Sequence, residues 1–486
     1  MTSGAGANDI GEFVRDYVER NRRAIALVGD NVFYFGELGM QEFETMGLLT
    51  NVLEQGGFKV ERGIAGLPTG FCATFGEGGP VVALHTEYDA VPDNSQAAGV
   101  TRKQSIVEGA PGHCEGHNVN AAVLVGAAMA TAAAMKRYGI KGTLKVFGGP
   151  AEEQLIGRPY MVRDGWFDDV DVAFHDHISS DYEAGYGIIQ SALISAKFTF
   201  HGESAHAGTA PWKGRDALDA VVLMDAGMAQ YREHMQPTSR MQRSFPEAGD
   251  QPNVTARIAS AWWYFRDANA EGARKLFEQA QKIARGAAMM TDTEVETEIL
   301  AAVWPLRGNR TLADLVWRHI EAVGMPDWSA EEQAFARELQ ANSGAKVEGL
   351  RTRAVRPAGE AKQRWSANDA GDVSWKTPMC KFYYPAMAPN LAAHHWAAGA
   401  PLATSIAHKA AASAARILAG AALDCMRDPA LVAQARRTFE EELGGVRYTS
   451  LLPPDQKPPV DLNRRTMEIF RPMMAAHYLK EKPVFT

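Results

Sequence analysis

A seven-residue segment, GHCEGHN at 112–118, places four potential metal ligands close together. They are His113, Cys114, Glu115 and His117, and imidazole, thiolate and carboxylate are the groups that bind Zn, Mn or Co. The alternative is a chance cluster of polar loop residues in which His117 caps a helix. We favour a metal site, because several ligand types in so few residues are uncommon.

Two adjacent glutamates, Glu152 and Glu153, supply the second requirement of a hydrolytic metal site. Such a site needs a carboxylate that activates water beside those that hold the metal. Adjacent residues at the end of a strand point to opposite sides, so one can bind metal while the other faces the water. A plain acidic loop is the alternative. The position after a strand and after Gly148-Gly149-Pro150 favours the catalytic interpretation.

Further histidines and carboxylates occur at other strand ends. Asp89, in HTEYDAVP, can orient a metal-binding imidazole or can simply cap a helix. His175 and His177 are two residues apart, which presents both to the same side of an extended chain. Either is also compatible with a hydrogen-bonded core histidine. His394, in the later segment HHW, has the same two interpretations.

Short apolar runs precede these groups and predict how they are positioned. The runs are 81–84, 144–147 and 170–174, and a helical pattern at 120–138 separates the first two. Alternating strands and helices predict an α/β domain with a largely parallel sheet. Functional sites of such sheets lie beyond the carboxyl ends of the strands. The sequence therefore predicts that the histidines and carboxylates meet at one edge.

The pattern changes near residue 192 and changes back near residue 304. In between, the order of predicted elements is β-α-β-β-α-β, which is typical of a compact antiparallel sheet with two helices. The predicted strands are 195–200, 253–259, 262–266 and 294–300, and the predicted helices are 215–234 and 270–290. We predict a catalytic domain at 1–191 and 304–450, an inserted domain at 192–303, and a C-terminal tail at 451–486 with no predicted element.

Composition and charge narrow the class of protein. The 486 residues carry a net charge of -8 with 46% hydrophobic residues, as in a mildly acidic globular protein, so neither nucleic acid nor a membrane is expected as a partner. Four scattered cysteines, a start (MTSGAGANDIGEF) without the features of a secretory signal, and an apolar run at 121–135 too short to span a membrane predict a cytoplasmic protein.

The motifs, in this order and spacing, resemble the dinuclear-metal aminoacylase and carboxypeptidase family over roughly residues 9–425. The segments that carry the resemblance are GLPTGF, EYDAVP, GHCEGHN, GPAEE, MVRDGWFDDVD, HGESAHAG, GRDALDAVVLM, PNV, GAAMMTDT, GDVSWK and TSIAHK. The resemblance implies an α/β fold with a metallo-exopeptidase-like catalytic domain, a mostly parallel central sheet, and an inserted ferredoxin-like lid and dimerisation domain. It also implies two divalent metal ions per chain: Mn, Zn or Co.

The resemblance also implies a role for each matching residue. Asp89 corresponds to the aspartate that orients a metal-binding imidazole, and Glu152 to the general base. His206 corresponds to a histidine that crosses a dimer interface to polarise the scissile carbonyl. The implied metal ligands are Glu115, His117, Glu153, His177 and His394. The implied substrate-binding residues are Asn253 and Arg266.

One position departs from the family pattern. Relatives have a cysteine two residues before the ligand His117, whereas this chain has Glu115 there and Cys114 one residue earlier. If Glu115 binds metal, the site is richer in oxygen and suits Mn or Co. In the alternative, Cys114 binds and Glu115 points away.

Together these features predict a metal-dependent amidohydrolase that cleaves the amide bond of an N-acyl or N-aroyl amino acid, for example one that contains glutamate. A hydrolase of another small aromatic amide or arylamine, using the same site, is the enzymatic alternative. A non-catalytic ligand-binding paralogue is the other, although such a protein has no need for a general base. The predicted partners are a small-molecule amide, a second copy of the chain bound through the inserted domain, and a possible companion subunit.

Overall fold

The central sheet has seven strands in the order β1-β2-β4-β3-β5-β13-β6 in the computed structural model, which describes residues 7–486. The strands are β1 (Lys59–Arg62), β2 (Phe71–Glu77), β3 (Val81–Glu87), β4 (Gly142–Gly149), β5 (Val172–Ser179), β6 (Glu183–Ala184) and β13 (Met379–Pro385). The neighbours β4, β3, β5 and β13 pair in parallel, whereas the pairs β1–β2, β2–β4 and β13–β6 are antiparallel. The predicted α/β fold with a mostly parallel sheet is therefore confirmed.

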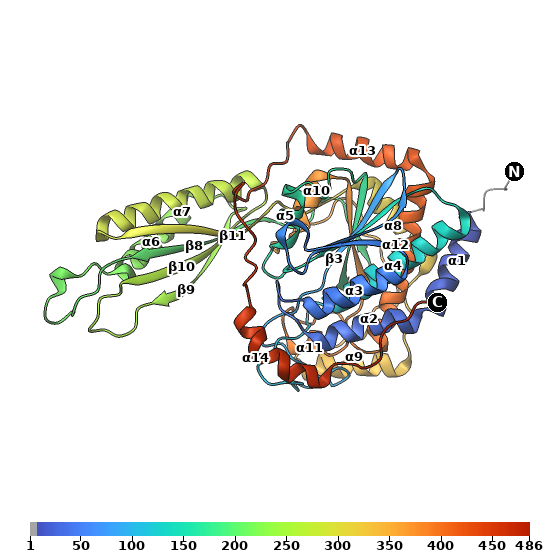
Figure 1. Ribbon diagram of the computed structural model, residues 1–486, viewed down its shortest axis with the longest axis horizontal. Helices are drawn as coiled ribbons and strands as arrows, with labels where there is room; N and C mark the ends of the chain where they lie inside the picture. Colours follow the sequence, from blue (N-terminus) through green and yellow to red (C-terminus); the bar gives the residue numbers. More distant parts are fainter. Residues whose placement is uncertain (1–6) are drawn as a thin grey trace.

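Helices cover both faces of this sheet (Figure 1). The helices of this domain are α1 (Ala7–Arg20), α2 (Arg22–Phe35), α3 (Phe43–Gln55), α4 (His117–Tyr138), α5 (Gly157–Arg163), α8 (Arg310–Val323), α9 (Ala330–Asn342), α10 (Gly371–Lys376), α11 (Trp396–Gly399), α12 (Ser405–Arg427), α13 (Pro429–Leu443) and α14 (Arg464–Met474). Helices α2, α4, α8 and α12 share one apolar core with the sheet, and α5 and α10 belong to the core of the opposite face.

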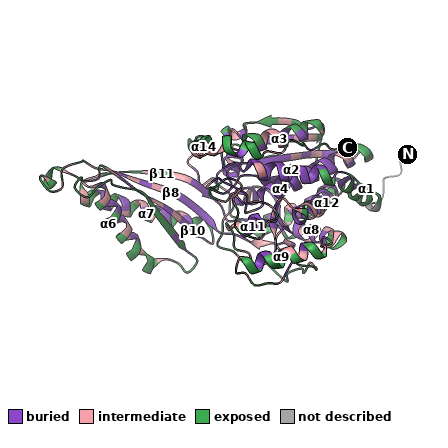
Figure 2. Ribbon diagram, turned by 90° about the horizontal axis from the view of Figure 1, so that it is seen from below, coloured by how far each residue is buried: buried purple, intermediate pink, exposed green. Residues whose placement is uncertain are grey.

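Helix α4 is the most buried of the long helices, and Figure 2 shows it inside the domain. It is long and apolar enough to span a membrane by length and composition, so the prediction that no segment reaches that length is wrong. The apolar pattern extends beyond 121–135 because the helix begins at His117 and ends at Tyr138. In the structure, 94% of its most apolar stretch of 18 residues is buried inside the protein, as expected of a core helix.

The second sheet forms a separate elongated layer, which projects to the left in Figure 1. Its four antiparallel strands lie in the order β11-β8-β10-β9, and α6 and α7 pack against it. The elements are β8 (Ala192–His201), α6 (Ala217–Tyr231), β9 (Arg240–Ala248), β10 (Ile258–Asp267), α7 (Ala270–Thr291) and β11 (Glu294–Val303). We call this layer, residues 192–303, the lid.

One predicted strand of the lid is wrong. The structure has no strand over residues 253–257, and the missing strand is β9 at Arg240–Ala248. Strand β9 lies at the edge of the sheet, and all of its residues except Met241 are exposed. An exposed edge strand lacks the apolar alternation on which the prediction depends.

The C-terminal segment, for which no element is predicted, folds along the catalytic domain. It descends between the lid and the central sheet, forms α14, and returns toward α1 and α2 (Figure 1). The backbone amide of Thr486 donates to Asn21 Oδ1 at 2.7 Å, and Arg471 forms an ion pair with the buried Glu37. Gln456 Nε2 also donates to the backbone oxygen of Ile299 in the lid, at 2.6 Å. The segment therefore contacts both layers.

Candidate active site

The strand ends bring together seven of the ten residues predicted for the site. In the parallel register, Glu87 at the end of β3 pairs with Gly149 at the end of β4, and β5 runs alongside. Asp89 and Glu152 therefore leave neighbouring strands at the same edge, and His177 lies near the end of β5. The seven residues are Asp89, Glu115, His117, Glu152, Glu153, His177 and His394.

His117, the first residue of α4, lies at the centre of this group. Its Nδ1 is 3.1 Å from Asp89 Oδ1 and 3.0 Å from the backbone oxygen of Asp89. Burial alone would lower the pKa of His117, but the hydrogen bond to Asp89 and the charge of that carboxylate hold the pKa well above its usual value. Because Asp89 accepts the hydrogen bond from Nδ1, Nε2 is the nitrogen that can bind a metal ion once it loses its own proton.

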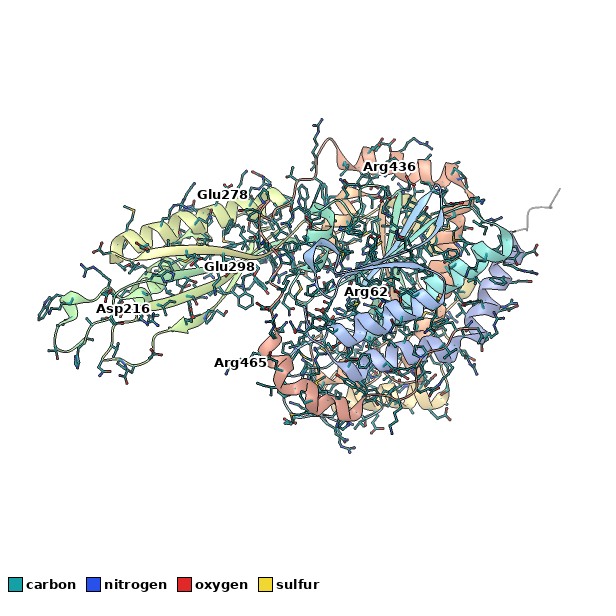
Figure 3. The ribbon with its side chains drawn as sticks, in the orientation of Figure 1. Arg62, Asp216, Glu278, Glu298, Arg436 and Arg465 are labelled. Atoms are coloured by element: carbon teal, nitrogen blue, oxygen red, sulfur yellow. The ribbon has the colours of Figure 1, made fainter. Side chains whose placement is uncertain are left out.

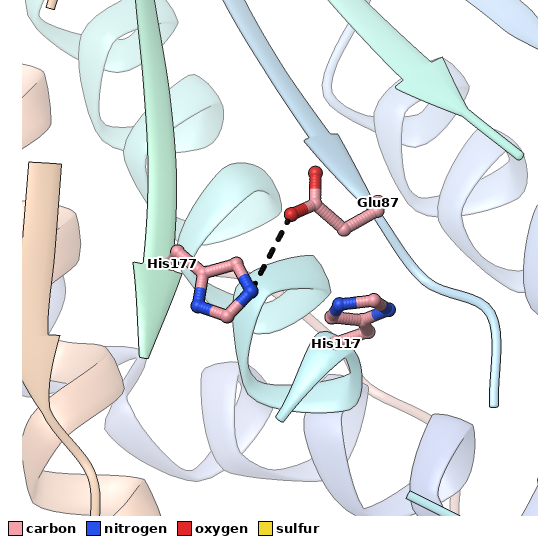
Figure 4. A group of neighbouring side chains, drawn as sticks. All are labelled: Glu87, His117 and His177. Atoms are coloured by element: carbon pink, nitrogen blue, oxygen red, sulfur yellow. Dashed lines mark ion pairs between the residues drawn. The ribbon is translucent and has the colours of Figure 1, made fainter. Parts of the chain in front are cut away.

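The atoms around His117 Nε2 fit a metal ion. Glu152 Oε2 lies 3.7 Å from Nε2, and His117, Glu152 and Glu153 each offer a ligand atom within 4.8 Å of the others. Glu87, His117 and His177 form a second such group, in which His177 Nε2 is 3.8 Å from Glu87 Oε1 (Figure 4). His117 Nε2 and Glu153 Oε1 are buried and accept or donate no hydrogen bond within residues 7–486. Buried polar atoms without partners are expected where a metal binds.

The two adjacent glutamates occupy different positions, as predicted for neighbours at a strand end. Glu152 Oε1 accepts a hydrogen bond from Asn368 Nδ2 at 2.6 Å, whereas the backbone amide of Glu153 donates to Asp89 Oδ2 at 3.0 Å. Burial and the negative charge of Glu87 raise the pKa of Glu152. Burial also raises the pKa of Glu153 to about 8. Both carboxylates are therefore in a setting that favours added positive charge.

Glu115 and Cys114, the two competitors in GHCEGHN, have different surroundings. His394 Nε2 lies 3.3 Å from Glu115 Oε1 and 3.5 Å from Glu153 Oε2. Cys114 is buried in a small apolar cluster with Val91 and Ala398, and burial raises the pKa of its thiol. Glu115 therefore faces the ligand group, and Cys114 packs as an apolar side chain.

The sequence argument missed a buried charge network beneath the site. Arg158 Nη1 donates to Glu87 Oε2 at 2.6 Å, and Arg158 Nε donates to Asp369 Oδ1 at 2.6 Å. All three side chains are fully buried. Burial alone would raise the pKa of Glu87, but the charge of Arg158 and the hydrogen bond from His175 hold it well below its usual value. The only sequence signal was the placement of Glu87 two residues before Asp89, on the same side of the strand.

His175 and His395 have structural roles. His175 Nε2 is 2.7 Å from Glu87 Oε2, and its ring stacks on that of His85. Burial lowers the pKa of His175 to about 3, so the ring is neutral. His395 caps α11 through a hydrogen bond that its Nδ1 accepts from the amide of Ala397. These residues support the site without belonging to the candidate ligand groups.

The structure places the three predicted lid residues at opposite ends of the lid. His206 and Asn253 lie near the end of β8 farthest from the central sheet, where the amide of Ala207 donates to the backbone oxygen of Asn253. The ten residues of β8 span about 33 Å at ~3.3 Å per residue. Arg266 lies at the other end of the lid, where it donates to the backbone oxygen of Trp365. His206 and Arg266 therefore do not meet within one chain.

Buried imidazoles and carboxylates at the carboxyl end of a mostly parallel sheet define a metal-dependent hydrolase. Residues 83–455 match the profile of peptidase family M20/M25/M40, and the chain belongs to that family. The resemblance inferred from the motifs is thereby confirmed, as is the prediction of a hydrolase that acts on amide or peptide bonds.

Particular relatives cover the chain to different extents. The chain is 32% identical over 476 residues to one of the subunits of p-aminobenzoyl-glutamate hydrolase of Escherichia coli. The aligned residues cover 93% of this chain and 99% of that protein. It is 30% identical to Xaa-Arg dipeptidase of Mus musculus over 54% of this chain and 58% of that protein.

Solved structures show the same fold at lower sequence identity. A putative aminohydrolase from methicillin-resistant Staphylococcus aureus has a TM-score of 0.63 at 18% identity, with 85% of this chain and 99% of that chain covered. An aminobenzoyl-glutamate utilization protein from Klebsiella pneumoniae has a TM-score of 0.59 at 19% identity, with 84% of this chain and 97% of that chain covered.

Proposed function

We propose that this chain hydrolyses the amide bond of an N-acyl or N-aroyl amino acid of the p-aminobenzoyl-glutamate type. The observation that carries the proposal is the unpartnered Nε2 of His117, buried between Glu152 and Glu153 and held in one tautomer by Asp89. Similarity over nearly the whole chain to the Escherichia coli p-aminobenzoyl-glutamate hydrolase protein supports the substrate class. The residues that would hold two divalent ions are Glu115, His117, Glu153, His177 and His394.

Each residue then has a defined task. Held by these residues, two divalent ions would supply the positive charge that acidifies water and stabilises the oxyanion. Glu152 takes the proton of the attacking water and returns it to the leaving amine nitrogen, and Asn368 orients its carboxylate through the 2.6 Å hydrogen bond. Asp89 keeps the proton of His117 on Nδ1. With Glu115 in place of a thiolate, the oxygen-rich ligand set favours Mn or Co over Zn.

The lid completes the site from a second copy of the chain in this proposal. His206 is exposed, and its Nδ1 accepts hydrogen bonds from the amides of Gly208 and Thr209, which leaves the proton on Nε2. A proton at Nε2 can polarise a carbonyl. Trp212 and Val254 nearby are 73% and 40% exposed, as expected of an interface surface. Asn253 beside His206, and Arg266 at the lid base, would bind the substrate.

The companion subunit and the compartment are part of the same proposal. The Escherichia coli relative is named as one of two subunits of its hydrolase. The other subunit also matches this chain, at 30% identity over 48% of this chain and 56% of that protein. We therefore infer that a second type of subunit can assemble with this chain. Four buried free cysteines support a reducing, cytoplasmic environment.

Metal content and a matched substrate panel test the proposal. The full chain is dialysed against chelator, reloaded with Mn, Co or Zn, and assayed on p-aminobenzoyl-glutamate, N-acetylglutamate and 4-nitroacetanilide. We expect activity to return with Mn or Co and to favour the two glutamate conjugates. Less than one bound ion per chain, with turnover that chelator does not change, would overturn the metal mechanism. Preferred cleavage of 4-nitroacetanilide would favour the arylamide alternative.

A further inference from the structure

A cavity of about 730 Å³ lies beside the candidate metal ligands, and none of the seven site residues lines it. It is bounded by the segment 183–189, the first turns of α8, and the loop 356–364. Cavities of this size are typical of small-molecule sites, at about 300–1,000 Å³. Three aromatic side chains line it: Tyr186, Trp317 and Tyr383. Trp317 and Tyr383 are buried, so their rings form a fixed apolar wall.

The basic side chains of the cavity exceed its acidic ones by one. Two of the bases are neutralised, because Arg356 pairs with Asp314 and Arg364 pairs with Glu183 at 2.5 Å. The remaining lining charges are two bases, Arg310 and Lys362, and one acid, Glu360.

Neither Arg310 nor Lys362 forms an ion pair within the described part of the chain, residues 7–486. The guanidinium of Arg310 lies over the ring of Tyr186, 5.3 Å from its centroid. Lys362 is exposed on the loop. Two cations beside an aromatic wall suit a ligand that combines a flat apolar body with a negative charge.

Tyr383 lies between the cavity and the candidate metal ligand His177. Two cations lie near its ring, with Arg364 5.2 Å and Lys381 Nζ 5.1 Å from the centroid. The same ring lies 5.8 Å from the ring of His177, its neighbour in the parallel register. A ligand against Tyr383 would therefore be one side chain away from a candidate metal ligand.

We propose that this cavity binds a small aromatic carboxylate, whose ring packs on Tyr186 and Tyr383 and whose charge meets Arg310 and Lys362. This chemistry is found in two kinds of molecule: the acidic or aromatic end of a bound substrate, and a free aromatic acid. The binding itself does not depend on the proposed hydrolysis, so it can be tested without turnover.

Calorimetry with benzoate on the chelator-dialysed full chain tests binding, since metal ions cannot then hold the carboxylate. We expect one benzoate per chain, and at least tenfold weaker binding in the double variant Arg310→Ala/Lys362→Ala, which breaks no ion pair of the structure. Neutral benzamide should bind more weakly than benzoate and be insensitive to the double variant.

The matched control for this experiment is Arg436→Ala on the outer surface of α13, labelled in Figure 3, which removes a similar cation 5.6 Å from the ring centroid of Phe439. It should leave benzoate binding unchanged. If the double variant fails to fold, Lys362→Glu in the exposed loop replaces it, with the same expected loss. Absence of benzoate binding to the unmodified chain, or equal binding by the variants, would overturn the proposal.

Steady-state kinetics of the metal-loaded enzyme separate the two sources. If the cavity holds one end of the substrate, benzoate competes with p-aminobenzoyl-glutamate, and Arg310→Ala/Lys362→Ala raises KM while kcat stays within about twofold. If it holds a free acid, benzoate inhibits without competing and the double variant leaves KM unchanged. Loss of hydrolysis with retained benzoate binding would instead count against the proposed function alone.

Discussion

The central sheet and the sheet of the lid present chemically active residues in opposite ways. The central sheet collects Asp89, Glu152 and His177 from three strands whose ends are adjacent, and Asp89 and Glu152 are buried. The lid instead presents His206 on an exposed loop beyond the far end of β8. The residues of the central sheet lie together within one chain, whereas we propose that His206 serves the site of a second copy.

The largest expected effect is at the central sheet. Glu152→Gln keeps the shape of the side chain and its hydrogen-bonding capacity but removes the base, so kcat should fall by roughly 10²–10⁴. Metal content, measured by elemental analysis, should stay the same. Unchanged turnover would show that another group accepts the proton.

The buried network beneath the site should control stability. Arg158→Met leaves Glu87 and Asp369 buried without their cation, which costs about 3–5 kcal/mol in comparable buried pairs. Denaturant unfolding measures the change. The control Arg22→Met removes an exposed pair with Glu19 and should cost less than about 1 kcal/mol. Equal effects of the two variants would contradict the role of the network.

At the lid, His206→Ala should lower kcat by about 10²-fold, as loss of an oxyanion donor does. The exposed His201 of the same domain supplies the control His201→Ala, which should have no effect. Mixed dimers decide between the two arrangements. A mixed dimer of one His206→Ala chain and one Glu152→Gln chain should be active if His206 serves the partner's site, because one of its two sites then has both residues. Inactive mixed dimers would place its action within one chain and remove the contrast between the sheets.

Within GHCEGHN, metal affinity shows whether Glu115 or Cys114 is the metal ligand. Glu115→Ala should weaken metal binding at least tenfold, since the carboxylate faces His394 and ligand-shell changes have effects of this size. Cys114→Ala, in the apolar cluster, should leave metal affinity unchanged. Competition with a metal-sensitive dye measures both. The reverse result would assign the ligand to the thiolate.

The smallest expected effect concerns the contact between the C-terminal segment and the lid. The register of β11 shifts between Ile299 and Ala301, and the oxygen of Ile299 accepts the 2.6 Å hydrogen bond from Gln456. Gln456→Ala should destabilise the fold by about 1 kcal/mol. Hydrogen exchange should increase at the base of the lid and not at its tip. Unchanged exchange at the base would show that the contact does not restrain the lid.

Several features were predictable because they depend on neighbours in the sequence. The β-branched runs before Asp89, Glu152 and His177 identify the strands, and parallel pairing then requires that their ends meet. Strand β9 was not predictable, because its exposed edge position removes the apolar alternation. Helix α14 was not predicted for a related reason, since only Met467 and Met474 of its eleven residues are buried.

The family, the order of the elements, and the chemical groups that follow each strand can all be read from the sequence. How those groups interact depends on the folded chain. Arg158 is 71 residues from Glu87 and 211 from Asp369, and no local pattern indicates that their charges meet. Likewise, Glu115 and Cys114 are adjacent, and only the packing of Val91 and Ala398 around the thiol distinguishes them. Periodicity reports local geometry, whereas burial and charge pairing depend on contacts that folding alone creates.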